Sequence, residues 1–368
     1  MNDMRIGIAG AGLAGRLLAW RLLRTGYAVT LFDRDDGSGQ ESAAYAAAAM
    51  LAPYSETVGS GHALIEPGLR AIEIWRAWLA ELEQDSGLSV PWQQRGSVVV
   101  AHPLDRGELT WFQQKLQTLT PESAADCQFL NAAALYEVEP ELSAFSEALY
   151  LPREGCIDNR ALFAALTRAL TQRGADWHSG QTILEVSAGR ILTTSGSHAF
   201  TLALDCRGTG AKAQMPGLRG VRGELLWLHA PEVKLNRPVR LMHPRYQLYI
   251  APRPEQVYVI GATELESESM APITVRSELE LLSALYSVHE GFSEASVLEA
   301  RSHCRPAFAD NLPKISLSEG LMRVNGLYRH GYLLGPLLVE SALAALHGQG
   351  PLPPIKCEGA LFAREELH

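Results

Sequence analysis

Paired cysteines are missing from this sequence. It has five cysteines in 368 residues, at positions 127, 156, 206, 304 and 357, and none of them forms a C-x-x-C pair. Neither a disulfide framework nor a zinc site is therefore indicated, and we expect no metal site. Scattered free thiols suit a reducing compartment, so we expect a cytoplasmic protein.

An excess of positive charge and a long apolar run are missing as well. The formal net charge is −9 at pH 7, which does not favour nucleic acid or an anionic membrane as the main partner. The alanine-rich run at 43–52 is shorter than the roughly 20 apolar residues of a membrane-spanning helix. We therefore expect no nucleic-acid partner and no membrane span.

The composition that remains is typical of a globular protein. Hydrophobic residues make up 47% of the chain and charged residues 20%, which is an ordinary balance for a folded domain. A length of 368 residues exceeds one ordinary hydrophobic core. Two domains are therefore the natural expectation.

The N-terminal stretch carries the clearest motif. Its expected elements follow one another as strand, helix and strand, at residues 5–9, 13–24 and 29–32. Gly10, Gly12 and Gly15 stand between the first strand and the helix, spaced G-x-G-x-x-G, and Asp33 ends the second strand. This order is the context that a dinucleotide-binding fingerprint requires.

Each residue of the fingerprint has a physical role. Gly10 permits the tight turn, Gly12 lets a pyrophosphate approach the backbone, and Gly15 lets the helix pack close to the strand. Free N–H groups at the helix start suit the phosphate charges. Asp33 lies 18 residues beyond Gly15, where its carboxylate can accept the ribose hydroxyls of an adenosine. The fingerprint alone does not separate NAD from FAD.

The rest of the chain alternates between two kinds of pattern. We expect helices at 42–51, where small residues would leave the backbone open to a flat ligand, and at 66–83, 109–119, 131–136 and 159–173, the last begun by Asp158. A buried strand at 199–204 leads to a second glycine turn at Gly208. From 221 to 300 the pattern indicates antiparallel strands, with an inserted helix at 275–286 that Thr274 can cap.

Several separated motifs together resemble one known family. Besides residues 10–33 they are Tyr249-Ile250-x-Pro252-Arg253, Gly261-Ala262-Thr263, Arg305-Pro306, and the segment from Asn325 to Pro336. In this order they resemble the glycine oxidase-like branch of the FAD-dependent D-amino acid oxidase family, over nearly the whole chain.

The resemblance implies a fold and a division into domains. The fold class is α/β, with a Rossmann-type FAD-binding domain interleaved with a substrate domain of antiparallel β-sheet plus helices. The implied FAD-binding domain comprises residues 1–86, 150–221 and 301–368, and the implied substrate domain comprises residues 87–149 and 222–300. Composition shifts near residues 87, 150, 222 and 300 fit this plan.

The resemblance also implies FAD as the cofactor, and the late glycine turn is consistent with it. A reduced flavin carries negative charge at its pyrimidine end, which backbone N–H groups around Gly331 to Gly335, before an expected helix at 336–347, could stabilise. Beside the fingerprint, the implied cofactor contacts are Leu13, Ala14, Arg34, Ala49, Met50, Leu51, Gly208, His330, Gly331, Tyr332, Leu333 and Leu334.

Substrate chemistry is expected at three residues that match positions of the family's site. Arg305 stands where the family holds the carboxylate of an amino acid, and a guanidinium fork suits that task. Tyr249 matches a tyrosine that lines the site, and Arg329 matches a further arginine of the site. Two features depart from the family. Glu264 stands where an apolar residue is usual, and could recognise a second amine or face solvent; Cys304 lies near a position where related enzymes tether flavin.

The implied activity is oxidation of a primary or secondary amine in a small amino acid such as glycine, sarcosine or a D-amino acid. Hydride transfer to flavin N5 would be followed by hydrolysis of the imine and by reoxidation with dioxygen, which yields hydrogen peroxide. Three alternatives remain: a flavin dehydrogenase that passes electrons to a quinone or a protein, a non-catalytic flavin-binding partner protein, and an NAD dehydrogenase. The oligomeric state is open, with a homo-oligomer as one option.

Overall fold

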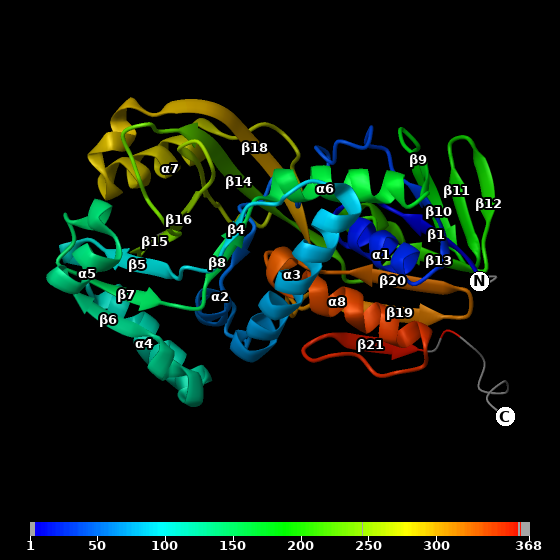
Figure 1. Ribbon diagram of the computed structural model, residues 1–368, viewed down its shortest axis with the longest axis horizontal. Coiled ribbons are helices and arrows are strands. Elements are labelled where there is room, and N and C mark those ends of the chain that lie inside the picture. Colours follow the sequence, from blue (N-terminus) through cyan, green and yellow to red (C-terminus); the bar gives the residue numbers. More distant parts are fainter. Residues whose placement is uncertain (1–3, 245, 360, 362–368) are drawn as a thin grey trace.

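The computed structural model describes residues 4–244, 246–359 and 361, and it contains two large sheets (Figure 1). The first sheet has the strand order β21-β19-β20-β13-β1-β2-β9. Its strands are β1 (Arg5–Ala9), β2 (Ala28–Phe32), β9 (Asp176–His178), β13 (Leu202–Asp205), β19 (Lys314–Ser318), β20 (Leu321–Asn325) and β21 (Lys356–Gly359). All neighbours are parallel except β19 and β20, which pair antiparallel. The sheet therefore combines strands from the N-terminal, middle and C-terminal parts of the chain, with β1 paired to β2 and β13.

Both faces of the first sheet are covered. Ile6 and Ile8 of β1 belong to the core shared with the helices α1 (Leu13–Arg24), α3 (Ile65–Ser86), α6 (Asn159–Gln172) and α8 (Gly331–Leu346). Ala9 points to the opposite face, into a second cluster with Val186 and Ile191. Those two residues come from a small antiparallel sheet of β10 (Ile183–Ser187), β11 (Arg190–Thr193) and β12 (Gly196–Ala199). Side chains that alternate along β1 thus face the helices on one side of the sheet and the small antiparallel sheet on the other.

The second sheet has the order β18-β14-β17-β16-β15-β5-β7-β6 and lies on the left in Figure 1. Its strands are β5 (Ser97–Ala101), β6 (Gln128–Asn131), β7 (Glu147–Leu151), β14 (Arg219–His229), β15 (Val239–His243), β16 (Tyr246–Pro252), β17 (Val257–Gly261) and β18 (Ser296–Ala307). All pairs are antiparallel except β5 with β15. The sequence pattern of antiparallel strands between 221 and 300 is confirmed.

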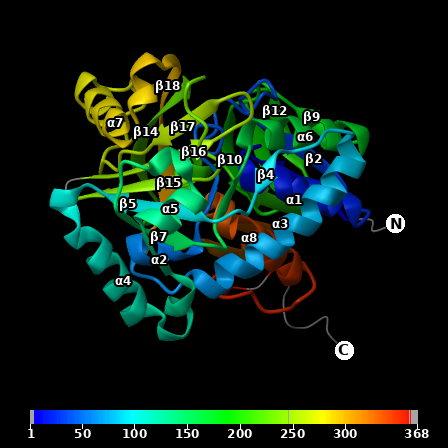
Figure 2. The ribbon, with the colours of Figure 1, turned by 60° about the vertical axis from the view of Figure 1, so that its left-hand side comes forward.

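Helices cover both faces of the second sheet as well. Val98 and Val100 of β5 pack in the cluster that includes α5 (Ala132–Val138) and α7 (Val275–Val288), whereas Val99 faces α2 (Pro53–Ser60) and α4 (Gly107–Leu119). A third, small sheet of β3 (Met50–Leu51), β8 (Gly155–Ile157) and β4 (Trp92–Gln93) lies between the two large ones. Figure 2 shows the same two regions from another side.

The predicted fold class is confirmed: a mostly parallel sheet covered by helices is interleaved in sequence with an antiparallel sheet that also carries helices. The exact division into domains stays a prediction. The long strands β14 and β18 pair along their whole length and cross the predicted boundaries near residues 222 and 300.

The expected helix caps are present. The Asp158 side chain accepts the backbone N–H of Ala161 at 2.9 Å, and the Thr274 side chain accepts that of Ser277 at 3.2 Å. These contacts satisfy N–H groups that a helix leaves without a partner in its first turn.

The helix predicted at residues 42–51 is wrong. The segment forms successive turns and ends in the short strand β3. Its carbonyls are held by distant side chains: Asn159 Nδ2 donates to Tyr45 O at 2.7 Å, and Arg253 Nη2 donates to Ala48 O at 2.6 Å. These tertiary hydrogen bonds outweigh the helix propensity of alanine, which amounts to only a few tenths of a kcal/mol per residue.

The late helix begins at Gly331, five residues before the expected start at Pro336. Proline has no N–H for the carbonyl four residues earlier, which belongs to Tyr332. That carbonyl instead accepts the indole N–H of Trp75 on α3, at 2.6 Å. The helix therefore runs through Pro336 without leaving the Tyr332 carbonyl unsatisfied, and the N–H groups expected around Gly331 to Gly335 belong to its first turns.

Candidate active site

Two adjoining cavities lie between the first and second sheets, with volumes of about 380 and 450 Å³. Their walls share six residues: Leu13, Ala43, Ala44, His303, Pro306 and Leu327. The two cavities are therefore parts of one elongated site. The first cavity contains the glycine turn after β1, and the second contains the start of α8.

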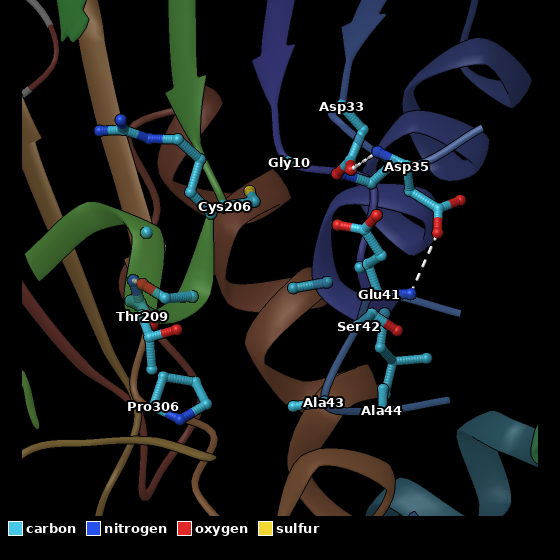
Figure 3. A pocket seen from close by; sticks show the side chains of 18 of the residues that line it. Gly10, Asp33, Asp35, Glu41, Ser42, Ala43, Ala44, Cys206, Thr209 and Pro306 are labelled. Carbon is cyan, nitrogen blue, oxygen red and sulfur yellow. Dashed lines mark hydrogen bonds between the residues drawn. The ribbon is translucent and has the colours of Figure 1, made fainter. Parts of the chain in front are cut away.

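Gly10 and Gly12 of the fingerprint line the first cavity, and Figure 3 shows Gly10 at its wall together with Asp33. Gly10 adopts a φ of +98°, a backbone conformation that favours glycine. A Cβ on Gly15 would lie 1.8 Å from the carbonyl oxygen of Gly10, so this glycine is required by helix packing. A Cβ on Gly12 would meet only the Ser42 Cβ, at 3.8 Å. Gly12 is therefore not demanded by the protein's own packing, and it leaves open space at the wall of the cavity.

Asp33 holds the backbone beside that space. Its carboxylate accepts the N–H of Ala11 and, at 2.8 Å, the N–H of Asp35. The Asp35 carboxylate in turn accepts the N–H groups of Gly37, Gly39 and Glu41, at 2.8, 2.6 and 3.0 Å. Each Asp33 oxygen keeps a lone pair for a ribose hydroxyl. The loop that carries the acidic residue is thus fixed before any ligand arrives.

The N-terminus of α1 opens into the first cavity. Arg16 N–H makes the first bond inside the helix, to the carbonyl of Gly12 at 3.0 Å, and no described side chain caps this end. The N–H groups of Leu13 and Ala14 are therefore free to bind an anion, with the helix dipole in their favour. A pyrophosphate fits this donor set, and an adenosine fits Asp33 beside it.

The second cavity has a wall of backbone and small side chains. It includes the alanines 43, 44 and 46–49, followed by Met50. Gly331 and Tyr332 form another part of the wall, at the start of α8, where no side chain of the described residues caps the helix. Tyr332 Oη donates to Ala44 O at 2.9 Å, which joins the two parts. A flat ring can approach such a wall closely, and the helix start supplies N–H groups for negative charge.

Arg305 is the open positive charge of the second cavity. Its guanidinium lies flat over Gly223, where a Cβ would come within 2.2 Å of Nη2, and Nη1 donates to Thr263 O at 3.2 Å. In the described part of the chain no carboxylate lies within ion-pair distance of Arg305. Tyr249 lines the same cavity, and burial raises the pKa of its phenol, so the hydroxyl stays protonated.

Arg329 also lines the second cavity, but its positive charge is paired with two carboxylates, those of Glu56 and Glu264. Its Nε lies 2.9 Å from Glu56 Oε2, its Nη2 lies 3.0 Å from Glu56 Oε1, and its Nη1 lies 2.9 Å from Glu264 Oε2. Burial would lower the pKa of Arg329, but Glu56 and Glu264 raise it above its ordinary value. A direct role of Arg329 in binding substrate stays a prediction.

Glu56 is the centre of this charged group and gave no signal in the sequence. Burial would raise the pKa of its carboxyl, but Arg329 and His330 hold that pKa well below its usual range. His330 is fully buried, with Nδ1 at 2.9 Å from Glu56 Oε2, and Arg240 Nη2 lies 3.7 Å from Glu56 Oε1. Glu56 lies on α2, whereas its partners come from β15 and from the segment before α8, so only the folded chain brings them together.

The structure places most predicted site residues at the walls of the two cavities. The first cavity is lined by Gly10, Gly12, Leu13, Ala14, Asp33, Arg34 and Gly208. The second is lined by Leu13, Ala49, Met50, Tyr249, Arg305, Arg329, Gly331 and Tyr332. Predicted residues that do not line either cavity are Gly15, Leu51, His330, Leu333 and Leu334. The three leucines are buried in the hydrophobic core instead.

Cys304 lines the first cavity and not the second. Its thiol is buried, with Sγ at 3.8 and 3.7 Å from the carbonyl oxygens of Ser267 and Ser269, and burial raises its pKa. It is a packed, protonated thiol beside the nucleotide half of the site.

The fold and the site define a class: an α/β protein with a dinucleotide-binding type of glycine turn and, in the same elongated site, an arginine that has no carboxylate partner among the described residues. Comparison with known proteins narrows it. Residues 5–343 match the family model of the FAD-dependent oxidoreductases, with the short name DAO. The chain belongs to this family and is an FAD-dependent oxidoreductase. The expected resemblance and the expected cofactor are confirmed, and the NAD-dependent and non-catalytic alternatives are set aside.

Individual relatives extend over nearly the whole chain. The chain is 37% identical over 349 residues to a putative thiamine biosynthesis oxidoreductase ThiO of Rhizobium etli, covering 94% of this chain and 98% of the relative. Glycine oxidase of Geobacillus kaustophilus has a similar fold, with a TM-score of 0.81 at 24% identity, covering 94% and 96% of the two chains. Iminodiacetate oxidase from Chelativorans sp. BNC1 follows with 0.79 at 22% identity, covering 96% and 99%.

Two features are absent from the described residues. Within them no helix is both long and apolar enough to cross a membrane. The same residues contain no group of three or more His, Cys, Asp or Glu side chains that could hold a metal ion.

Proposed function

We propose that this protein oxidises the primary or secondary amine of a small amino acid, in the manner of a glycine, sarcosine or D-amino acid oxidase. The observation that carries the proposal is the unpaired guanidinium of Arg305, which faces the cavity that the alanine wall and the start of α8 enclose. A bidentate carboxylate is the natural ligand of such a group. Two proteins of similar fold, a glycine oxidase and an iminodiacetate oxidase, support a substrate with an amine next to a carboxylate.

The residues of the second cavity then have distinct tasks. Arg305 binds the carboxylate of the substrate, and the neutral Tyr249 hydroxyl donates a further hydrogen bond to it. Together they fix the position of the α-carbon, and positioning of this kind is a large part of catalysis. FAD, when bound, supplies the redox chemistry by accepting a hydride from that carbon.

Each acidic side chain that lines the cavity, among the described residues, has a basic partner: Glu56 and Glu264 pair with Arg329, and Glu280 pairs with Arg276. His303 also lines the cavity, and its two ring nitrogens lie 3.1 and 3.0 Å from backbone carbonyl oxygens. The depressed pKa of Glu56 makes it a poor proton acceptor. The amine therefore enters the reaction already neutral, and the chain contributes orientation, exclusion of water and the N–H groups at the start of α8.

Two finer parts of the proposal concern the surroundings of the reaction. Electrons pass to dioxygen and yield hydrogen peroxide, with a quinone or protein acceptor as the alternative. The five cysteines are all free thiols, which supports a cytoplasmic location.

A substrate panel tests the proposal. The purified yellow protein is mixed under anaerobic conditions with glycine, sarcosine, D-alanine and iminodiacetate, and the flavin absorbance is followed. We expect at least one of these amines to bleach the flavin within seconds. Bleaching followed by stoichiometric hydrogen peroxide on admission of air identifies an oxidase, whereas slow reoxidation in air and fast reoxidation by a quinone identifies a dehydrogenase. If no amine bleaches the flavin, amine oxidation is the wrong reaction.

A further inference from the structure

Glu264 occupies an unusual place in the second cavity. Its side chain is about half exposed, yet both of its oxygens are engaged: Oε1 accepts the Tyr328 hydroxyl at 2.5 Å, and Oε2 lies 2.9 Å from Arg329 Nη1. Glu264 comes from the loop after β17, and its two partners come from the segment before α8. The carboxylate therefore connects two distant segments across the wall of the cavity.

The loop that carries Glu264 is held in place by hydrogen bonds to buried side chains. Arg222 is buried and donates from Nη1 to Ser269 O and Ala271 O, at 2.6 and 2.7 Å. Thr263, next to Glu264, donates from Oγ1 to the buried Glu224 at 3.0 Å, and Glu224 is paired with Arg222. The position of Glu264 is thus set by buried anchors on both of its sides, and its contact with Arg329 belongs to a fixed arrangement.

The charges around the cavity leave one cation open. Arg329 is bound by Glu56 and Glu264, and Arg240 lies near Glu56. Arg276, which also lines the cavity, pairs with Glu280 at 3.6 Å. Of the described arginines that line the cavity (240, 276, 305 and 329), Arg305 is therefore the one that has no carboxylate beside it. One open cation accommodates one substrate carboxylate, because a second would lie near Glu264 without a counter-charge.

We propose that Glu264 is a specificity-determining residue, which restricts the substrate to amino acids with a single carboxylate by occupying the Arg329 guanidinium that a second carboxylate would need. This inference rests on the proposed amine oxidation and names its substrate class. Glu264 acts as an internal anion: it is tethered beside Arg329, so it competes with a free dicarboxylate at a high effective concentration. It also repels the distal carboxylate of a substrate such as iminodiacetate, so the discrimination combines an occupied cation with a repulsive charge.

The test compares glycine or sarcosine, as the monocarboxylate, with iminodiacetate, as the dicarboxylate. The wild-type holoenzyme should prefer the monocarboxylate in kcat/KM. Glu264→Gln and Glu264→Ala should raise the ratio of kcat/KM for iminodiacetate over the monocarboxylate by roughly ten- to hundredfold, which is what one charge-assisted hydrogen bond contributes. The matched control is Glu266→Gln, from the same loop. Glu266 pairs with Arg219 at 2.8 Å and does not line the cavity, so the ratio should stay at its wild-type value.

A binding measurement covers the case in which a variant loses activity. Succinate and acetate cannot be oxidised at an amine, and their binding is read from the shift they cause in the flavin spectrum. Succinate should bind more tightly, relative to acetate, in both Glu264 variants than in wild type. The inference is overturned if neither the kcat/KM ratio nor the ratio of succinate to acetate affinity changes by more than about twofold. It is also overturned if wild type already prefers iminodiacetate, or if the variants lose a preference for substrates with a second amine. Failure of the proposed function looks different, because no amine would then bleach the wild-type flavin.

Discussion

At the scale of single residues, two fingerprint glycines lie in opposite surroundings. A Cβ on Gly15 would collide with the carbonyl oxygen of Gly10 at 1.8 Å, whereas a Cβ on Gly12 would enter open space, 3.8 Å from the Ser42 Cβ. The backbone φ of Gly12 is −71°, which any residue adopts. Gly15 therefore serves the packing of the fold, whereas the open space at Gly12 fits its predicted contact with the pyrophosphate of FAD.

This contrast predicts two different defects. Gly12→Ala should leave the stability of the FAD-free protein unchanged and weaken FAD binding about tenfold or more, because the methyl group occupies the approach of the phosphates. Gly15→Ala should lower the free energy of unfolding of the FAD-free protein by about 1–3 kcal/mol, the usual cost of overpacking. Urea unfolding and FAD titration by fluorescence separate the two effects. Tight FAD binding by Gly12→Ala would contradict this assignment of the first cavity.

Gly223 leaves the space that the Arg305 guanidinium occupies, because glycine has no Cβ. A Cβ at Gly223 would lie 2.2 Å from Nη2 and 2.3 Å from Cζ of Arg305. The guanidinium is the end of a flexible side chain, so it can move aside at little cost in stability. We therefore expect Gly223→Ala to fold and to bind FAD, while kcat/KM for the amino acid falls roughly ten- to hundredfold, mainly through KM. Gly107→Ala, where a Cβ would meet nothing within 4 Å, is the control. An unchanged KM in Gly223→Ala would show that Arg305 does not need this position.

At the scale of elements, the start of α8 depends on a helix from elsewhere in the chain. Pro336 lies inside α8 and leaves the carbonyl of Tyr332 without a helical donor, and Trp75 of α3 supplies its indole N–H at 2.6 Å. This bond lets the helix begin at Gly331, so that its free N–H groups reach the second cavity. Trp75 also belongs to the hydrophobic core, and its additional role as a donor to Tyr332 has no local signature in the sequence.

The Trp75 bond can be measured by a double-mutant cycle. Trp75→Phe should lower the free energy of unfolding by about 1–3 kcal/mol, because it leaves a buried carbonyl unsatisfied. Pro336→Ala returns an N–H to the helix, so in that background Trp75→Phe should cost clearly less. Chemical unfolding of wild type, the two single variants and the double variant gives the coupling free energy between Trp75 and Pro336. Equal costs in both backgrounds would mean that the indole N–H contributes nothing at this carbonyl.

Asp85 joins three helices on the far side of the first sheet. At the end of α3 it accepts hydrogen bonds from Trp20 and Arg24 of α1 and from Arg173 after α6. Burial would raise the pKa of Asp85, but Arg173 and Arg24 lower it from 3.8 to about 2. Since the folded pKa lies below the unfolded one, the stabilisation is complete above pH 3.8 and is lost as the pH falls toward 2.

Asp85→Asn should therefore lower the free energy of unfolding by about 1–2 kcal/mol at pH 7, after allowance for solvent screening. The difference between variant and wild type should shrink as the pH falls below 4, since the wild-type carboxylate then becomes protonated. Urea unfolding at pH 7, 5 and 3 measures it, with Glu83→Gln on the exposed side of the same helix as the control. A difference that stays constant over this range would show that the charge of Asp85 does not stabilise the fold.

At the scale of the whole molecule, local motifs could be predicted from the sequence, and long-range arrangements could not. Residues 10–33 were predictable because the strand, glycine turn and helix are contiguous, so sterics and periodicity determine them together. The turns at 42–49 were not, because hydrogen bonds from Asn159 and Arg253 outweigh a helix-forming composition. Glu56 was not either, because its partners come from other elements that meet only when the two sheets pack.

The residues that line the two cavities lie far apart in the sequence. The family resemblance could therefore point to them, whereas the spacing of residues within one segment could not. Their walls take residues from the glycine turn after β1, from α1, the alanine turns, the second sheet including the end of β18, and the start of α8. If FAD binds along these walls as predicted, it bridges these segments, and its binding free energy adds to the stability of the whole chain. Arg305 and Tyr249 lie on different strands, and only the sheet places both in one wall.

The most direct test of the account is anaerobic flavin reduction in wild type and in Arg305→Ala, with the best amine of the panel. The account predicts rapid bleaching in wild type, and in the variant a second-order rate constant at least about a hundredfold lower, with FAD still bound. Direct reduction by dithionite should be unchanged in the variant, because it does not use the substrate site. Bleaching of Arg305→Ala by the amine at the wild-type rate would contradict the central claim that Arg305 holds the substrate carboxylate against the flavin.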